Sequence, residues 1–352
     1  SIAWIDPGGS LKVGPQSAGA EPGPVCYDAG GTKPTVTDCN LALGYMNPNA
    51  LLAGRLAIRG DKAGASIETY LAKPLGISVD EAASGVLNVV NASMAEALRI
   101  VSVERGHDAR EFSLVAFGGA GPMHAAELAN ELGITQVIIP PIAGGFSALG
   151  LVASDLKRDY VKTHFTALDE ASTNDVAAAF TEMESAAHLM LEAAKIPKSD
   201  WRMERAADLR YGRQAYELTV PAPDGPVSQD TLDELAQLFH EKHRQTYGHD
   251  NPEEAVQLVN LRLTAIGRFK NLELAHEPHH DGDPLQGRRD VWFPHGGRQP
   301  CEIYDYGKLA SGFELSGPAI LEAIDTTIVV PPNWFAKMNH SGHILMEASH
   351  DS

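Results

Sequence analysis

The fold is decided by the stretch Phe112-Ser113-Leu114-Val115-Ala116-Phe117-Gly118-Gly119-Ala120-Gly121-Pro122. Its first six residues form an apolar run that predicts a buried strand, and residues 124–132 predict a helix that ends at Gly133. A second apolar run over residues 135–140 predicts another strand. Strand, helix and strand within about 30 residues make a βαβ unit, which implies that the two strands pair in parallel.

The glycines between the first strand and the helix favour contact with a phosphate or a nucleotide. Glycine lets the backbone adopt positive φ and approach a ligand closely, and the start of a helix offers unpaired N–H groups. The spacing matches neither the dinucleotide-binding pattern nor the P-loop pattern. A tight turn that needs small residues for packing explains the same spacing, so the pattern alone leaves both readings open.

The rest of the chain divides near Thr166 into two expected domains, 1–165 and 166–352. In the first, residues 1–49 read as short strands and turns, and Ser78 with Glu81 predicts a capping box that opens a long helix reaching about Gly106. The second alternates strands and helices and then continues as short β-runs with turns. Its expected elements are helices at 174–195 and 230–247, strands within 208–220 and 256–266, and the β-runs of 290–346.

Composition excludes several classes of function. The formal net charge of the 352 residues is -18, and Lys and Arg form no cluster, which argues against nucleic acid and anionic membranes as partners. No apolar run reaches the ~20 residues that span a bilayer, and the first residues do not resemble a signal peptide. The cysteines Cys26, Cys39 and Cys301 form no C-x-x-C pair, which favours a reduced, cytoplasmic setting.

Several motifs resemble, in order along the chain, those of the hydantoinase A/oxoprolinase family. They are Gly14 to Tyr27, Pro34-Thr35-Val36-Thr37-Asp38, Phe117 to Ala125, Asp208-Leu209-Arg210-Tyr211-Gly212-Arg213-Gln214, Gly317-Pro318-Ala319-Ile320, Thr326-Thr327 and Val330-Pro331-Pro332. The family includes ATP-dependent N-methylhydantoinases, 5-oxoprolinases and the ATP-binding subunits of acetone and acetophenone carboxylases. The chain resembles the C-terminal half of such a protein.

This resemblance implies an α/β fold: part of an actin-like or sugar-kinase-like ATPase lobe, followed by an α+β C-terminal domain. It implies ATP with Mg²⁺ as cofactors, and adenosine binding at Gly118, Gly119, Ala120 and Gly121. In this superfamily the β- and γ-phosphates are held by two other glycine hairpins, which lie earlier in the chain, and the resemblance covers only the second half of a full family member. The implied partners are therefore an N-terminal half with these loops, from the same gene or a separate chain, and a B-type subunit.

Asp38 and His124 are the candidate catalytic residues. Asp38 lies in a family motif and either holds a metal or water or caps a helix. His124 lies one turn into the helix after the glycine loop and either contacts a ligand or packs there. Arg210, Tyr211 and Gln214 belong to a motif that shapes either a substrate site or a subunit interface. The histidines have no spacing that indicates a metal site.

Three functions remain open at this point. In the first, the chain is part of an ATP-dependent hydrolase of cyclic amides, which phosphorylates the amide oxygen so that water can attack. In the second, it is part of an ATP-dependent ketone carboxylase. The segments Cys26-Tyr27-Asp28 and Gly44-Tyr45 slightly resemble the sequences of that branch of the family. In the third, it is a non-catalytic half-subunit of such a complex. The small-molecule substrate is not indicated by the sequence.

Overall fold

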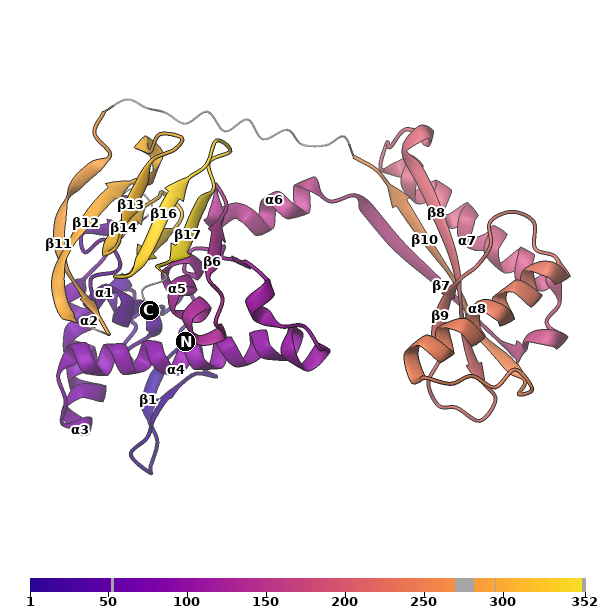
Figure 1. The fold of residues 1–352 in the computed structure, drawn as a ribbon, viewed down its shortest axis with the longest axis horizontal. Helices are drawn as coiled ribbons and strands as arrows, with labels where there is room; N and C mark the ends of the chain where they lie inside the picture. Colours follow the sequence, from indigo (N-terminus) through magenta and orange to yellow (C-terminus); the bar gives the residue numbers. More distant parts are fainter. Residues whose placement is uncertain (52–53, 270–281, 295, 350–352) are drawn as a thin grey trace. The chain divides into compact units, whose positions relative to one another are not determined.

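The structure, a computed structural model, describes residues 1–51, 54–269, 282–294 and 296–349. It contains two compact units (Figure 1): unit 1 comprises Ser1–Gly150 with Leu274–Ser352, and unit 2 comprises Leu151–Glu273. Unit 2 is thus inserted into the sequence of unit 1. The contiguous domains expected at 1–165 and 166–352 differ from this division, because the last strand of the chain pairs with a strand before the insertion.

The larger sheet of unit 1 has the strand order β13-β16-β17-β6-β5. Its strands are β5 (Leu114–Val115), β6 (Gln136–Ile139), β13 (Glu314–Ser316), β16 (Trp334–Met338) and β17 (Ile344–Ala348). Strands β5 and β6 pair in parallel, which confirms the predicted βαβ unit. The other pairs are antiparallel, so this sheet is mixed, and the βαβ unit occupies only one of its edges.

A second sheet of unit 1 has the order β11-β12-β14-β15, and two short hairpins accompany it. Strands β12 and β14 are parallel, and the other pairs of this sheet are antiparallel. Its strands are β11 (Leu285–Phe293), β12 (Gly297–Asp305), β14 (Ala319–Glu322) and β15 (Thr327–Val330). The hairpins are β1 (Ala3–Ile5) with β2 (Leu11–Val13), and β3 (Ala50–Leu51) with β4 (Leu56–Ala57).

Unit 1 also contains several α-helices. They are α1 (Val36–Ala42), α2 (Gly60–Ile67), α3 (Lys73–Leu75), α4 (Val79–Val101), α5 (Gly121–Leu132) and α6 (Phe146–Ala153), of which α6 spans the boundary to unit 2. Helix α4 opens with the predicted Ser78–Glu81 capping box. By length and composition, residues Val79–Arg105 could cross a membrane, contrary to expectation, but helix α4 packs against α1 and α5.

Unit 2 is a four-stranded antiparallel sheet with two helices. The strand order is β7-β10-β8-β9. The elements are β7 (Leu156–Ala167), α7 (Thr173–Ala193), β8 (Trp201–Tyr211), β9 (Leu218–Pro221), α8 (Gln229–Tyr247) and β10 (Val256–Gly267). Apolar side chains of both helices and of the sheet form one core, which includes Phe180, Leu235 and Leu261. The two helices and the strands β8, β9 and β10 match elements expected after residue 166. Strand β7 was not expected, and the boundary expected near Thr166 falls within it.

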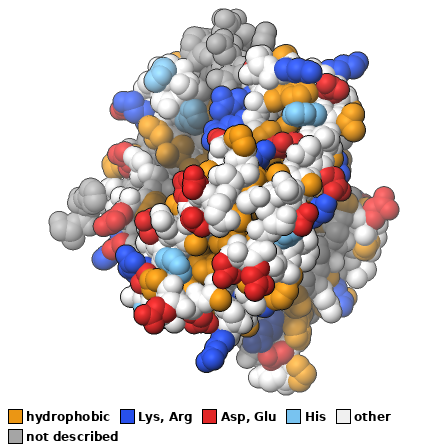
Figure 2. All heavy atoms as spheres, turned by 90° about the vertical axis from the view of Figure 1, so that its right-hand side faces the viewer, with side chains coloured by type: hydrophobic (Ala, Val, Ile, Leu, Met, Phe, Trp, Pro, Cys, Tyr) orange, Lys and Arg blue, Asp and Glu red, His pale blue; other side chains and the backbone are white. Residues whose placement is uncertain are grey.

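The described residues of unit 1 form more than one apolar core. Helix α5, the larger sheet and strand β15 enclose one core, which contains Ala125, Ile139 and Trp334. Helices α1 and α4 with the second sheet enclose another, which contains Leu43, Val86 and Phe293. On the face drawn in Figure 2, acidic and basic side chains are interspersed.

Candidate functional site

The glycine loop joins strand β5 to helix α5. Gly118 has a φ of 89°, a left-handed conformation that residues with a Cβ rarely adopt. Its N–H donates to the carbonyl oxygen of Ala143 at 2.7 Å. The helix begins at Gly121, with Pro122 in its first turn, where a missing N–H costs nothing. The expected start near His124 was therefore too late.

Thr326 binds the glycine loop from a segment more than two hundred residues later in the chain. Its Oγ1 lies 3.2 Å from the carbonyl oxygen of Gly118 and 3.1 Å from that of Gly119, so one hydroxyl hydrogen serves both acceptors. Thr326 is buried. Because buried hydrogen bonds are costly to break, this hydroxyl fixes the orientation of two successive peptide groups of the loop.

Asp325 holds a second glycine turn against the same segment. The N–H of Gly144 donates to Asp325 Oδ2 at 2.8 Å. A Cβ on Gly144 would lie 2.4 Å from the carbonyl oxygen of Asp325, closer than real Cβ contacts allow. Gly144 is therefore required for this close approach of two backbone segments.

A cavity of about 340 Å³ lies where these segments meet helix α1. Its wall combines apolar side chains, hydroxyl and amide groups, and backbone of the glycine loop. The lining residues are Tyr27, Val36, Thr37, Asn40, Met46, Leu56, Gly119, Ala120, Met123, Ala323, Ile324, Asp325, Thr326 and Thr327. Asp325 is the one charged residue in this set, and the set holds no Lys or Arg.

Asp38 is buried at the start of helix α1. It occupies the third helical position, and its Oδ2 accepts from the N–H and the hydroxyl of Thr35 at 2.9 and 2.7 Å, which completes a capping box. Its Oδ1 accepts from the N–H of Cys26 at 2.8 Å, and its Oδ2 also accepts from the N–H of Val25 at 3.2 Å. These bonds use the acceptor sites of the carboxylate to connect α1 with the preceding loop.

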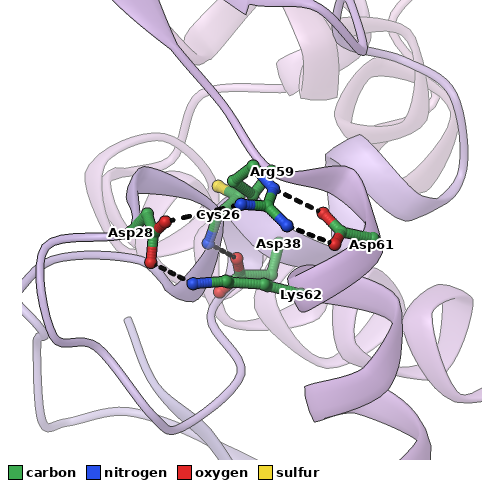
Figure 3. A network of polar contacts seen from close by, with 6 residues as sticks. All are labelled: Cys26, Asp28, Asp38, Arg59, Asp61 and Lys62. Carbon is green, nitrogen blue, oxygen red and sulfur yellow. Dashed lines mark hydrogen bonds and ion pairs between the residues drawn. The ribbon is translucent and has the colours of Figure 1, made fainter.

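An exposed ion-pair network lies beside Asp38 (Figure 3). Arg59 donates to both oxygens of Asp61 at 2.9 and 2.7 Å, and Lys62 pairs with Asp28. Such exposed pairs contribute little to stability. Cys26 is buried next to Asp38. Burial is the larger cause and the negative charge of Asp38 the smaller cause that raise the pKa of the Cys26 thiol far above its usual value, so this cysteine does not supply a reactive thiolate.

His124 is buried between two asparagines. Its Nδ1 lies 2.8 Å from Asn91 Oδ1, and its Nε2 lies 3.5 Å from Asn40 Nδ2. Burial lowers its pKa to about 4, so the ring is neutral at pH 7. The side chain does not line the cavity, but Asn40 and Met123 beside it do. The polar contact that connects the His124 ring with the cavity lining is the one with Asn40.

The structure brings together some of the residues selected from the sequence. Gly119 and Ala120 line the cavity, Gly118 is fixed beside it, and Gly121 lines an apolar groove between α4 and α5 instead. Asp38 and His124 are buried and do not line the cavity. Sequence reasoning selected neither Asn40 nor Asp325, although each adjoins a family motif. Among the described residues, no group of three or more His, Cys, Asp and Glu side chains could hold a metal ion.

In unit 2, the motif around Tyr211 builds a buried polar cluster. The Tyr211 hydroxyl lies 2.7 Å from His240 Nδ1 and accepts from the N–H of Asn251 at 2.8 Å. Gln214 Nε2 lies 2.9 Å from His243 Nε2. Arg210 donates to Gln257 at 3.1 Å, across to the neighbouring strand. These contacts give Tyr211 and Gln214 a structural part in joining β8 to α8.

Two family models match the chain. The model described as Hydantoinase/oxoprolinase matches residues 1–160, and the model described as Hydantoinase/oxoprolinase C-terminal domain matches residues 166–348. Together they account for nearly all of the sequence.

Three curated proteins show the degree of similarity. An uncharacterized protein of Methanocaldococcus jannaschii is 40% identical over 348 residues, covering 99% of this chain and 49% of that protein. The caprolactamase subunit alpha of Pseudomonas jessenii is 34% identical, covering 99% of this chain and 51% of its own length. The acetophenone carboxylase gamma subunit of Aromatoleum aromaticum is 32% identical, and the match covers 99% of this chain and 49% of that subunit. The chain thus spans about half the length of these relatives.

Two solved structures are similar over the same extent. A nucleotide-free acetone carboxylase, from a study of ATP-dependent acetone carboxylation, has a TM-score of 0.81 at 25% identity and covers 99% of this chain and 51% of its own. The ATP-dependent caprolactamase of Pseudomonas jessenii has a TM-score of 0.75 at 35% identity, and the match covers 99% of this chain and 52% of the caprolactamase chain.

Proposed function

Because the chain belongs to the hydantoinase/oxoprolinase family, we propose that it supplies part of the ATP site of an enzyme that activates a cyclic amide by phosphoryl transfer. The relative whose activity is a cyclic-amide hydrolysis, caprolactamase, is 34% identical to the chain, and its solved structure is named ATP-dependent. Related proteins named as carboxylases share the dependence on ATP. Use of ATP is therefore the property that these relatives have in common.

The observation that carries the proposal is the cavity beside the glycine loop. Gly119 and Ala120 supply backbone to its wall, and Thr326 holds that backbone in place. The apolar part of the wall suits a purine and ribose, which bind largely through apolar and backbone contacts. No Lys or Arg lies among the described lining residues. This composition supports binding of the adenosine end, with the phosphates contacted by other parts of the protein.

In the proposed reaction, the amide oxygen of the substrate attacks the γ-phosphorus of ATP, and the bond to the departing ADP oxygen breaks. Water adds to the electrophilic carbon of the resulting O-phosphorylated imidate, and the ring opens as the C–N bond breaks and the nitrogen leaves as a protonated amine. A second water molecule then hydrolyses the acyl phosphate to the carboxylate and inorganic phosphate. Positioning and charge stabilisation supply most of the catalysis in such transfers. The residues of this cavity contribute positioning, because they hold the nucleotide at its adenosine end.

An actin-like ATPase lobe is the fold that we propose for the nucleotide-binding part. A glycine loop after β5 and a helix start at Gly121 support it. Mg²⁺ does not fit this cavity: Asp325 is its single lining carboxylate and already accepts from Gly144. Any metal would bind with the phosphates, so no step is assigned to it here.

The partners and the two candidate catalytic residues follow from the same proposal. Because the relatives are named as subunits and are about twice as long, we propose an N-terminal half with the phosphate loops, a B-type subunit and a cytoplasmic location. The contacts of Asp38 and His124 support roles in positioning the wall rather than in contacting the reacting atoms. Their catalytic roles stay predictions.

Ketone carboxylation is the second candidate function. The acetone carboxylase structure has a TM-score of 0.81, and the acetophenone carboxylase subunit is 32% identical to the chain. In this case ATP would activate bicarbonate and the enol of the ketone.

ADP release by the complete protein tests the proposal. The complex that contains this chain, purified with its partners, is incubated with ATP and either a lactam or hydantoin, or acetone or acetophenone with bicarbonate. We expect ADP release that depends on the cyclic amide. Release only with the ketone and bicarbonate would favour the carboxylase, and release with neither would overturn both functions.

A further inference from the structure

Strand β5 of the larger sheet is less buried than its sequence predicts. The apolar run from Phe112 to Phe117 is typical of a strand that is covered on both faces, as strands of parallel sheets are. In the structure, the side chains of Phe112, Val115 and Phe117 are 55%, 46% and 45% exposed. The segment thus combines the composition of a central strand with the exposure of an edge strand.

The backbone of β5 has a free edge. The strand is the last in the order β13-β16-β17-β6-β5. The N–H of Ala116 donates to the carbonyl oxygen of Ile138 in β6 at 2.9 Å. Because successive residues of a parallel strand direct their N–H groups to opposite edges, those of Val115 and Phe117 point away from β6. No strand of the described chain lies on that side, so this edge can accept another strand.

An apolar surface of helix α4 adjoins this edge. The apolar groove between α4 and α5 has a volume of about 350 Å³, and strand β5 contributes to its wall. None of its ten lining residues among the described ones has a charged or polar side chain. Met94, Ala97 and Leu98 line it from α4, and the exposed Val101 continues the same helix face one turn later. The free edge of β5, the groove and Val101 are called the β5–α4 surface below.

The length of the relatives indicates what covers the β5–α4 surface. The matches cover 51% of the caprolactamase subunit alpha and 49% of the acetophenone carboxylase gamma subunit, so each has about as much chain again outside the match. An uncharged groove beside an unpaired, apolar strand has the character of a domain core cut in half, which is typical of permanent interfaces. This character favours the other half of the family protein over a separately folded subunit or a second copy of this chain.

We infer that the N-terminal half of the complete protein adds a β-strand to the free edge of β5 and covers the groove beside α4. Backbone groups of that strand would bond the N–H groups of Val115 and Phe117, and its apolar side chains would enter the groove. The inference rests on the proposed function, which includes this half, and states where it binds. Since Phe117 is followed directly by Gly118, the added strand lies next to the glycine loop.

Photo-cross-linking in the complete protein tests which partner covers the surface. The photoreactive residue p-benzoylphenylalanine is placed at Val101 or at Val115, the protein is irradiated, and the linked peptides are identified by mass spectrometry. We expect both positions to link to peptides of the N-terminal half. Leu189 on helix α7 is the matched control, because it is an exposed apolar residue of unit 2 and should not link to the same peptides. Links to a B-type subunit or to a second copy of this chain, or no links, would overturn the inference.

Hydrogen exchange of the unmodified complete protein tests the added strand without any substitution. If β5 is paired on both edges, the amides of Val115 and Phe117 should exchange within about tenfold of the rate of Ala116, whose N–H bonds β6. If the edge is free, these two amides should exchange far faster than that of Ala116. The second result would overturn the strand pairing even where a cross-link forms.

ADP release distinguishes failure of this inference from failure of the proposed function. A complete protein that releases ADP with a cyclic amide, but forms no link to the N-terminal half and exchanges these amides rapidly, shows that the docking site alone is wrong. A protein that forms the links and protects the amides, but releases no ADP with any of the substrates, shows that the proposed function is wrong and the docking site is right.

Discussion

The backbone N–H of Gly144 donates to Asp325 Oδ2 at 2.8 Å, across a separation of 181 residues. Because a Cβ on Gly144 would lie 2.4 Å from the carbonyl oxygen of Asp325, Gly144→Ala should separate the two segments and distort the cavity wall. We expect a loss of about 2 kcal/mol in the free energy of unfolding, as for other overpacked sites. Urea denaturation measures it.

The control for this change is Gly64→Ala within helix α2. A Cβ on Gly64 would meet nothing within 4 Å, and alanine favours a helix, so the variant should be at least as stable as the wild type. Equal stability of Gly144→Ala and the wild type would show that the two segments are not held together as described.

Two glycines of the same loop should respond differently to alanine. Gly118 has a φ of 89°, whereas Gly121 begins helix α5 and has open space around its missing Cβ. Gly118→Ala should therefore cost about 1–2 kcal/mol of stability from backbone strain, and Gly121→Ala should cost little. Thermal denaturation of both variants makes the comparison. A Gly121→Ala variant as unstable as Gly118→Ala would contradict the assigned loop conformation.

Asp38→Asn should lower stability through the hydrogen bonds that it disrupts. In the wild type, backbone N–H groups donate to both carboxylate oxygens of Asp38. In the variant an NH2 group, which cannot accept, replaces one of these oxygens and faces those N–H groups. We expect a loss of about 2–4 kcal/mol, measured by urea denaturation. The exposed Asp28 offers the control, because Asp28→Asn should change stability only slightly. If Asp38→Asn lost activity at unchanged stability, the residue would act in the chemistry instead.

The buried ring of His124 should make stability depend on pH. Above pH 6.5 the ring is neutral in both the folded and the unfolded chain, so its full contribution is present. As the pH falls from 6.5 toward about 4, only the unfolded chain takes up the proton. The free energy of unfolding should therefore fall by about 3 kcal/mol over this range.

Denaturation curves of the wild type and His124→Gln at pH 7 and pH 5 isolate this effect. The variant should lose less stability between the two pH values than the wild type does. The exposed His107 serves as a control, because His107→Gln should keep the pH dependence of the wild type. Parallel pH profiles for the wild type and His124→Gln would show that folding does not lower the pKa of this ring.

The buried carboxylate of Asp208 should depend on Arg262. Burial alone would raise the pKa of Asp208, but hydrogen bonds from Arg262, Thr219 and Asn260 outweigh it and lower the pKa. Arg262 Nε lies 2.7 Å from both carboxylate oxygens. Arg262→Met would leave this charge buried with neutral donors only, at a cost of about 3 kcal/mol.

Thermal denaturation of unit 2 in the complete chain checks this cost. Arg202→Met is the matched control, because Arg202 and its partner Glu204 are both exposed and their ion pair should contribute little. Similar midpoints for the two variants would mean that Asp208 does not need its charged partner.

Local features of the fold could be predicted from the sequence. The Ser78–Glu81 capping box, the stop of α5 at Gly133 and the parallel β5–β6 pair each depend on residues that are close together in the chain. Short-range rules for capping, periodicity and connection length apply to such features. The family motifs selected Gly119 and Ala120, which line the cavity, but adenosine binding by them stays a prediction.

The division into units and most of the cavity wall could not be predicted in this way. The pairing of β17 with β6 and the bonds of Thr326 to Gly118 join residues about two hundred positions apart, and no local pattern encodes which distant segments meet. The pattern of Asp38 fitted both a cap and a catalytic group, and the structure gives it the contacts of a cap.

The insertion of unit 2 has a consequence for how the protein forms on the ribosome. Strand β6 is made before unit 2, but its neighbour β17 is made only at the end of the described chain, since Ile139 pairs with Ile344. At about 5–20 residues per second, translation leaves β6 without this partner for on the order of 10 seconds or more. During this time unit 2 emerges complete, while the bare edge of β6 offers unpaired backbone groups to other nascent chains or to chaperones.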